Sequence, residues 1–154
     1  MMRAADMMSR EVIHVTMDTR VEELASLLYE NGISGVPVLD DNGQLLGVVT
    51  ESDLIEQGKK LHIPTMIAFL DSVIFLESAS RFEKDMKKMS GCTVADIYSG
   101  TARWVDEEAD LETIATLMAE KKVHTLPVLR DGELVGVIGK RDLIKVMAGR
   151  LEGD

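Results

Sequence analysis

The chain contains 154 residues, of which 45% are hydrophobic and 29% are charged, enough to bury one core or two small ones beneath a hydrated surface. The 27 Asp and Glu outnumber the 17 Lys and Arg, and the formal net charge of −10 argues against nucleic acid as a main partner, because phosphate backbones are bound by basic faces. The composition therefore excludes a disordered tail and a fibrous chain and indicates a soluble globular protein.

The start of the chain and its single cysteine bear on where the protein works. The first ten residues hold no apolar stretch long enough for a signal peptide or a membrane span. Cys92 is the sole cysteine, which excludes an internal disulfide and a thiolate cluster for a metal. We therefore expect a cytoplasmic protein in a reducing compartment, without a membrane partner.

The first predicted elements are a strand over 12–16 and a helix that begins near residue 21. Thr19 and Glu22 have the spacing of a capping box, in which two side chains bond to backbone N–H groups at the start of a helix. Apolar residues then recur at helical spacing on one face, namely Val21, Leu24, Ala25 and Leu28.

A hairpin and a short helix follow in the first third of the chain. The apolar runs 36–39 and 45–49 flank the turn residues 41–43, whose sequence is Asp-Asn-Gly. Two short apolar runs on either side of such a turn predict an antiparallel pair of strands. A short helix is predicted over 53–56.

Residues 59–92 form a linker that is long and rich in apolar side chains. A linker of this kind is not expected to be fully solvated. Its apolar residues are expected to cover the folded units, and the alternative is a contact between subunits. These residues are Met66, Phe69, Leu70, Ile74 and Phe75.

The rest of the chain repeats its first part. At an offset of 90, Pro37 and the two residues after it align with Pro127 and the two residues after it. The second hairpin turn is one residue shorter, with Asp131-Gly132 as a two-residue turn, and beyond it Asp53 aligns with Asp142 at an offset of 89. A longer final helix is predicted over 142–148.

We predict an α/β (α+β) fold with two β-α-β-β-α repeats, over 1–58 and 93–154, joined by the linker 59–92. A unit of about fifty residues has too little apolar area to stand alone. The two repeats are therefore expected to pack face to face, as a pseudo-twofold module around one shared core. Ligand clefts are expected between them.

The order, spacing and duplication of these motifs resemble a tandem pair of cystathionine beta-synthase (CBS) domains. The resemblance rests on 32–38 with 47–53 in the first copy and on 123–128 with 136–142 in the second. It implies a stand-alone regulatory module that binds AMP, ADP, ATP or S-adenosylmethionine, forms a homodimer and controls a protein partner. It also implies that the protein is not an enzyme.

Thr50 and Asp53 are the first candidate pair for ligand binding. They lie where a strand ends and a helix begins, so a hydroxyl and a carboxylate are expected to face the cleft. The carboxylate accepts hydrogen bonds from ribose hydroxyls, and the hydroxyl donates to a phosphate. The alternative is a purely structural role at the start of the helix. The recurrence as Asp142 and the family pattern favour the ribose role.

Thr16, Thr50 and His124 are the preferred phosphate donors. The segment around His124 resembles the AMP-activated protein kinase gamma subunit, where a histidine touches phosphate, although Thr125 stands where that segment has arginine. The alternative for His124 is a structural histidine beside a strand.

The second copy departs from this phosphate-binding pattern. Asp106 occupies the position equivalent to Thr16, and Gly139 the position equivalent to Thr50. Because a carboxylate repels phosphate, the clefts are expected to be unequal, with one tight site on the first copy.

Adenine is expected to pair with backbone groups just before Pro37 and Pro127. No metal site and no catalytic residue is predicted, because the three histidines lack partners at helical spacing and no catalytic triad is evident. The alternative function is a ligand-free dimerisation or protein-interaction subunit with vacant clefts. The predicted ligand-binding residues are Thr16, Ser34, Gly35, Val36, Pro37, Thr50, Asp53, His124, Thr125, Leu126, Pro127 and Asp142.

Overall fold

The computed structural model of the chain describes residues 1–60, 92–100 and 103–149. The predicted packing of the linker residues Met66, Phe69, Leu70, Ile74 and Phe75 lies outside these ranges.

Two three-stranded sheets form the centre of the molecule. In each sheet the first strand is parallel to the second, and the second pairs with the third in an antiparallel hairpin. This arrangement confirms the predicted duplicated unit. The strands are β1 (Val15–Thr16), β2 (Gly35–Leu39) and β3 (Leu45–Thr50) in one sheet, and β4 (Val105–Asp106), β5 (Thr125–Arg130) and β6 (Glu133–Gly139) in the other.

Six described helices accompany the strands. The predicted helices after each hairpin are present but begin earlier than expected, and the first strand is shorter than the predicted 12–16. Two helices of four residues, α1 and α6, were not predicted. The helices are α1 (Ala4–Met7), α2 (Val21–Asn31), α3 (Glu51–Lys60), α6 (Val94–Ile97), α7 (Leu111–Glu120) and α8 (Lys140–Met147).

The helices α2 and α7 begin in different ways. The predicted capping box at Thr19 is wrong, because Arg20 is the N-cap residue of α2 and the Thr19 hydroxyl instead accepts from the Thr16 N–H at 3.1 Å. At α7 the Asp110 carboxylate accepts from the Thr113 N–H at 2.8 Å. This bond lowers the pKa of Asp110, because it stabilises the charged carboxylate.

The two hairpin turns follow their sequences. Asp131 and Gly132 both have positive φ, 51° and 83°, as a two-residue type I′ turn requires. In the longer first turn, the Asp40 carboxylate accepts from the N–H groups of Asn42 at 2.8 Å and Gln44 at 2.9 Å. Both predicted turns are confirmed.

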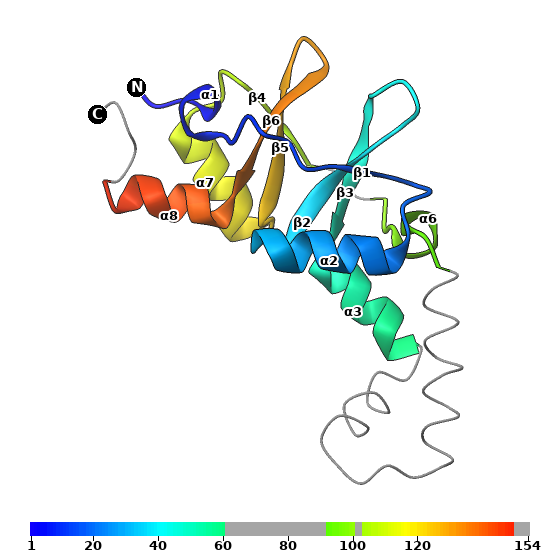
Figure 1. Cartoon of the computed structure of the whole chain (residues 1–154). Helices are drawn as coiled ribbons and strands as arrows, with labels where there is room; N and C mark the ends of the chain where they lie inside the picture. The colour runs from blue at the N-terminus through cyan, green and yellow to red at the C-terminus, as the bar shows by residue number, and fades with distance from the viewer. Residues whose placement is uncertain (61–91, 101–102, 150–154) are drawn as a thin grey trace, which may run out of the picture.

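The buried residues form two clusters, so the expected single shared core is wrong. Each cluster contains a segment that belongs to the other copy in the sequence. Ala4, Met7 and Met8 are buried with the second copy, whereas Val94 is buried with the first. We call residues 3–13 the first arm and residues 92–100 the second arm. Figure 1 shows α1 beside α7 and α8, and α6 beside α2 at the other end of the molecule.

Backbone hydrogen bonds fix each arm on the opposite copy. The Ser9 N–H donates to the Val137 carbonyl at 2.9 Å, and the Val137 N–H donates back at 3.0 Å. On the second arm, the Val94 N–H donates to the Thr19 carbonyl at 2.8 Å. Each arm thus supplies apolar area that a unit of about fifty residues lacks.

The arms approach the hairpins so closely that glycine is required at the contact. A Cβ on Gly47 would collide with the hydroxyl of Tyr98, and one on Gly136 would collide with the sulfur of Met8. The Tyr98 hydroxyl donates to the Leu46 carbonyl at 2.8 Å. Both glycines therefore serve the same purpose, which is to seat the arm of the opposite copy.

The two sheets meet at β2 and β5, which contact each other near the pseudo-twofold axis. Figure 1 shows both hairpin turns at one end of the sheets and the helices α2, α3 and α8 towards the other. Within the described ranges, no helix has the length and the apolar run needed to cross a bilayer.

Candidate ligand-binding clefts

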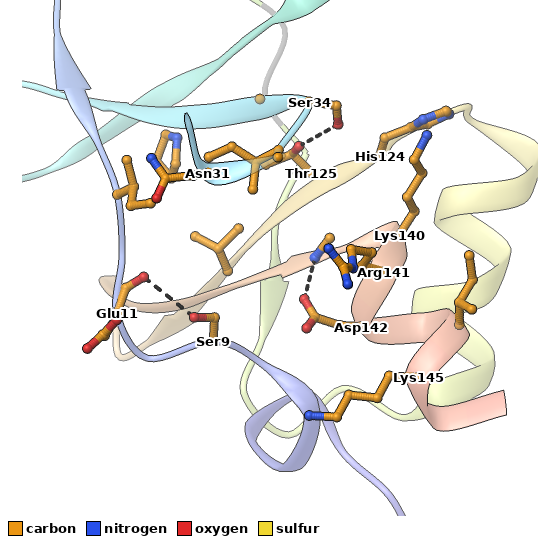
Figure 2. Close-up of a pocket in the computed structure, with 18 of the residues that line it drawn as sticks. Ser9, Glu11, Asn31, Ser34, His124, Thr125, Lys140, Arg141, Asp142 and Lys145 are labelled. Atoms are coloured by element: carbon orange, nitrogen blue, oxygen red, sulfur yellow. Dashed lines mark hydrogen bonds between the residues drawn. The ribbon is translucent and has the colours of Figure 1, made fainter. Parts of the chain in front are cut away.

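Two cavities lie between the repeats, and residues at equivalent positions of the two copies line them. The larger, of about 610 Å³, reaches the start of α8 and is called the Asp142 cleft (Figure 2). The smaller, of about 490 Å³, reaches the start of α3 and is called the Asp53 cleft. Both volumes fall within the range of small-molecule sites.

The elements that form the two clefts correspond through the repeat. The Asp142 cleft is bounded by the first arm, the end of α2 and the start of α8. The Asp53 cleft is bounded by Ser99 of the second arm, Arg103, the end of α7 and the start of α3. Each cleft thus depends on an arm that is docked on the opposite copy.

Asp53 lies in the first turn of α3, as predicted. One of its oxygens, Oδ2, accepts from the Thr50 N–H at 2.9 Å and from the Thr50 hydroxyl at 3.3 Å. Asp142 forms the equivalent bond, accepting from the Gly139 N–H at 2.7 Å (Figure 2). Because these bonds fall on Oδ2, the Oδ1 oxygen of each carboxylate remains to accept from a ligand.

The same hydrogen bonds show that Asp53 and Asp142 also cap the starts of their helices, which was the alternative role for Asp53. Asp6 and Asp96 accept from the N–H groups of Arg3 at 2.9 Å and Thr93 at 2.7 Å at the starts of α1 and α6, and neither carboxylate lines a cleft. The capping bond therefore accounts for the position of Asp53 and Asp142 but does not require a cavity beside them.

Ser34, His124 and Thr125 line both clefts, and we call these three residues the shared wall. The Ser34 and Thr125 hydroxyls lie 3.4 Å apart, with His124 exposed beside them (Figure 2). Thr125 is 6% exposed and is the one buried polar residue among those described. A Cβ on Gly35 would lie 2.9 Å from the Thr125 hydroxyl, so this glycine leaves room for the wall.

Several predicted residues lie elsewhere. Val36, Leu126 and Pro127 are buried and line neither cleft, whereas Gly35 and Pro37 line the Asp142 cleft. Thr16 also lines neither cleft, because it pairs with Thr19 at the end of β1.

Asp106 was expected to repel phosphate in the second cleft, but it does not line either cavity. Its carboxylate accepts from the Glu108 N–H at 3.0 Å and so stabilises the turn after β4.

Several charged residues of the clefts are not among the predicted ligand-binding residues. The Asp53 cleft is lined by Arg103, Lys121 and Lys122 of the second copy and, at the start of α3, by Glu51 as a second acid beside Asp53. The cations of the Asp142 cleft instead lie on α8 itself, and Glu11 of the first arm joins Asp142 as a second acid. The residues on α8 are Lys140, Arg141 and Lys145 (Figure 2).

The negative charge of Asp53 affects the pKa of Tyr98 in the second arm. Burial and then the negative charge of Asp53 raise the pKa of Tyr98, so its hydroxyl stays protonated and donates to the Leu46 carbonyl. In the part of the chain that the structure describes, no three His, Cys, Asp or Glu side chains gather as a metal site would need.

Comparison with known proteins gives the family of the chain. The family model for the CBS domain matches residues 4–60 and 94–149. The chain is 32% identical over 145 residues to the CBS domain-containing protein CBSX1, chloroplastic, of Arabidopsis thaliana. This match covers 90% of the chain and 61% of CBSX1, and the match to CBSX2 of the same plant, 30% identical, covers 60% of that protein.

Solved structures agree with this assignment. The crystal structure of CBSX2 in complex with AMP has a TM-score of 0.69 and 27% identity, and the match covers 96% of this chain and 97% of that one. The CBS-domain containing protein ATU1752 from Agrobacterium tumefaciens has the same fold, with a TM-score of 0.70 at 20% identity over 95% of this chain and 99% of that one. With two matches of the family model and two sheets of the same topology, the chain belongs to the CBS domain family as a tandem pair.

Proposed function

We propose that the protein is a regulatory module that binds an adenosine-containing ligand in the clefts between its CBS repeats and does not itself catalyse a reaction. AMP, ADP, ATP and S-adenosylmethionine are the candidate ligands. The observation that carries the proposal is the Asp53 cleft, where a helix-start carboxylate and three cations line the same cavity. The AMP complex of CBSX2, a relative of the same fold, supports it.

The Asp53 cleft suits the two polar ends of a nucleotide. The Oδ1 oxygen of Asp53 accepts from ribose hydroxyls, while Oδ2 holds the start of α3. Arg103, Lys121 and Lys122 on the opposite side supply charge for a phosphate, and His124 adds a ring N–H. Adenine then pairs with backbone groups of the cleft.

The Asp142 cleft offers the same ribose acceptor with a different charge arrangement. Asp142 shares the start of α8 with Lys140 and Arg141, whereas the arm side of the cleft carries Glu11. The phosphate of a ligand bound there is drawn towards the start of α8, where the Lys140 N–H donates to the His124 carbonyl at 3.2 Å. The proposal therefore includes a second, weaker site in this cleft.

Calorimetric titration of the nucleotide-stripped protein tests the proposal. We expect heat with at least one of the four candidate ligands. Asp53→Ala is expected to weaken binding by about 1–3 kcal/mol, because ribose hydroxyls lose their acceptor. Asp96→Ala is the matched control, because it removes the same kind of capping bond at a helix start without touching a cleft.

Two outcomes would contradict the proposal. One is the absence of heat and of thermal stabilisation with all four ligands at millimolar concentration. The other is an Asp53→Ala protein that is as stable as the Asp96→Ala protein and binds its nucleotide as tightly as the unaltered chain.

A role in subunit contact is the second candidate function. Three large apolar side chains on α3 and α8 are exposed, Ile55 by 62%, Ile144 by 60% and Met147 by 79%. Such a group of exposed apolar side chains favours a homodimer or a contact with a regulated protein partner. We propose that the protein carries out both ligand binding and subunit contact in the cytoplasm. Light scattering distinguishes a dimer of about 34 kDa, twice the chain mass of 17.0 kDa, from a monomer.

A further inference from the structure

The two clefts are not separate in space, because the same three side chains bound both. Ser34, His124 and Thr125 line the Asp142 cleft on one side and the Asp53 cleft on the other. Figure 2 shows Ser34, Thr125 and His124 together at the edge of the Asp142 cleft. A ligand group that touches this wall from one cleft therefore lies close to a group that touches it from the other.

The wall offers few hydrogen-bond donors. Each hydroxyl has one hydrogen to donate, and the hydroxyls of Ser34 and Thr125 face each other at 3.4 Å. When one of them donates to the other, the pair has one hydrogen left for both clefts. Because Thr125 is 6% exposed, water has little access to replace a lost partner of its hydroxyl.

Repulsion between bound phosphates, like the shortage of hydrogen-bond donors, opposes the binding of phosphorylated ligands in both clefts at once. Two phosphate groups that meet the wall from opposite clefts are like charges, and a partly desolvated wall screens their repulsion less than bulk water does. An uncharged ligand has no such repulsion. The shared wall itself contains no Lys or Arg, and each Lys or Arg that lines a cleft lines only one of the two.

We propose that the two clefts are negatively coupled for phosphorylated ligands, and that Ser34, His124 and Thr125 transmit this coupling. The inference rests on the proposed function, because it requires both clefts to accept an adenosine ligand. Filling one cleft with AMP then weakens AMP binding in the other, whereas adenosine fills the two clefts independently. The protein would respond to phosphorylated ligand over a wider concentration range than two independent sites do.

Titrations of three proteins with AMP and with adenosine test the coupling. The unaltered chain reports both clefts. Asp53→Ala reports the Asp142 cleft, and Asp142→Ala reports the Asp53 cleft, at ligand concentrations that leave the altered and weakened cleft largely empty. We expect AMP to bind the second cleft of the unaltered chain at least about fivefold more weakly than the single-cleft protein binds it. With adenosine, the affinities of the single-cleft proteins should reproduce the isotherm of the unaltered chain.

The outcomes separate this inference from the proposed function. AMP affinities that are the same in the unaltered chain and in the single-cleft proteins would overturn the coupling while leaving the proposed function intact. Equal coupling with adenosine would overturn its electrostatic origin. An unaltered chain that binds neither ligand would overturn the proposed function and the coupling with it.

A pair of isosteric substitutions tests the role of the wall. Thr125→Val removes the hydroxyl that both clefts share and keeps the volume of the side chain, so AMP binding should weaken in both single-cleft proteins. Thr50→Val removes a hydroxyl that lines the Asp53 cleft alone, so it should weaken AMP binding in the Asp142→Ala protein and not in the Asp53→Ala protein. If Thr125→Val also affects one cleft only, the wall does not transmit the coupling.

Discussion

At the scale of single residues, short local motifs carried most of what the sequence could predict about the clefts. Thr50 and Asp53 lie three residues apart at a strand-to-helix junction, and their positions are fixed by that junction alone. Ser34 and Thr125 were predicted from their places shortly before Pro37 and Pro127, and His124 from the family resemblance of its segment. All five line the Asp53 cleft.

Residues whose place depends on the opposite copy were beyond the reach of such motifs. Thr16 was chosen by analogy with the family, but the end of β1 lies away from both clefts. Lys121 and Lys122 end α7, and nothing in their local sequence tells which element they face. Only the packing of the two repeats brings them into the same cleft as Asp53.

The N-cap residue of α7 gives a prediction about pH. The Thr113 N–H bond lowers the pKa of Asp110, so this bond stabilises the fold above the ordinary pKa of the carboxyl and is lost as the pH falls through the lowered value. Asp110→Asn keeps a capping acceptor that does not titrate. Urea unfolding at about pH 7 and about pH 3 should show a smaller loss of stability in the variant than in the unaltered chain. An equal loss would contradict this role of Asp110.

At the scale of elements, the hydrophobic periodicity predicted the sheets and the long helices but missed the arms. Helices α1 and α6 have four residues each, too short to show a helical repeat of apolar side chains. In the sequence, only Gly47 and Gly136 hint at the contact between the arms and the hairpins, because an isolated glycine in a strand indicates a close backbone approach. The partners, Tyr98 and Met8, are far away in sequence.

A double-mutant cycle tests the contact between the second arm and the hairpin. Gly47→Ala should destabilise the fold by about 1–3 kcal/mol, because the new methyl group collides with Tyr98. In a Tyr98→Ala background the same change should cost little, because the colliding ring is gone. The free energies of unfolding of the four proteins measure the interaction. Additive effects would show that Tyr98 does not account for the glycine.

At the scale of the whole molecule, the exchange of arms ties the two repeats together. The repeat in the sequence correctly predicted two similar units but not that each would be completed by a segment preceding the other unit. The exchange of arms also shapes the clefts, because Ser9 of the first arm lines the Asp142 cleft and Ser99 of the second arm lines the Asp53 cleft. The inequality of the clefts stays a prediction, and it now rests on the different elements that carry the cations rather than on Asp106, which lines neither cavity.

The exchanged arms predict that the two cores unfold together. Met7 is buried in the core of the second copy and Val94 in that of the first, so Met7→Ala and Val94→Ala each remove core volume. We expect the former to cost about 2–5 kcal/mol and the latter somewhat less. Met147→Ala, at a position 79% exposed, should stay within about 0.5 kcal/mol and serves as the control.

Because each arm bonds to the opposite copy, both core variants should shift one cooperative transition in urea, followed by circular dichroism and tryptophan fluorescence. Trp104 precedes β4 of the second copy, so its fluorescence would reveal a core that unfolds on its own. Two separate transitions, with Met7→Ala moving one and Val94→Ala the other, would show that the arms do not couple the repeats. In that case the links between Ser9 and Val137 and between Val94 and Thr19 join the copies without making their unfolding cooperative.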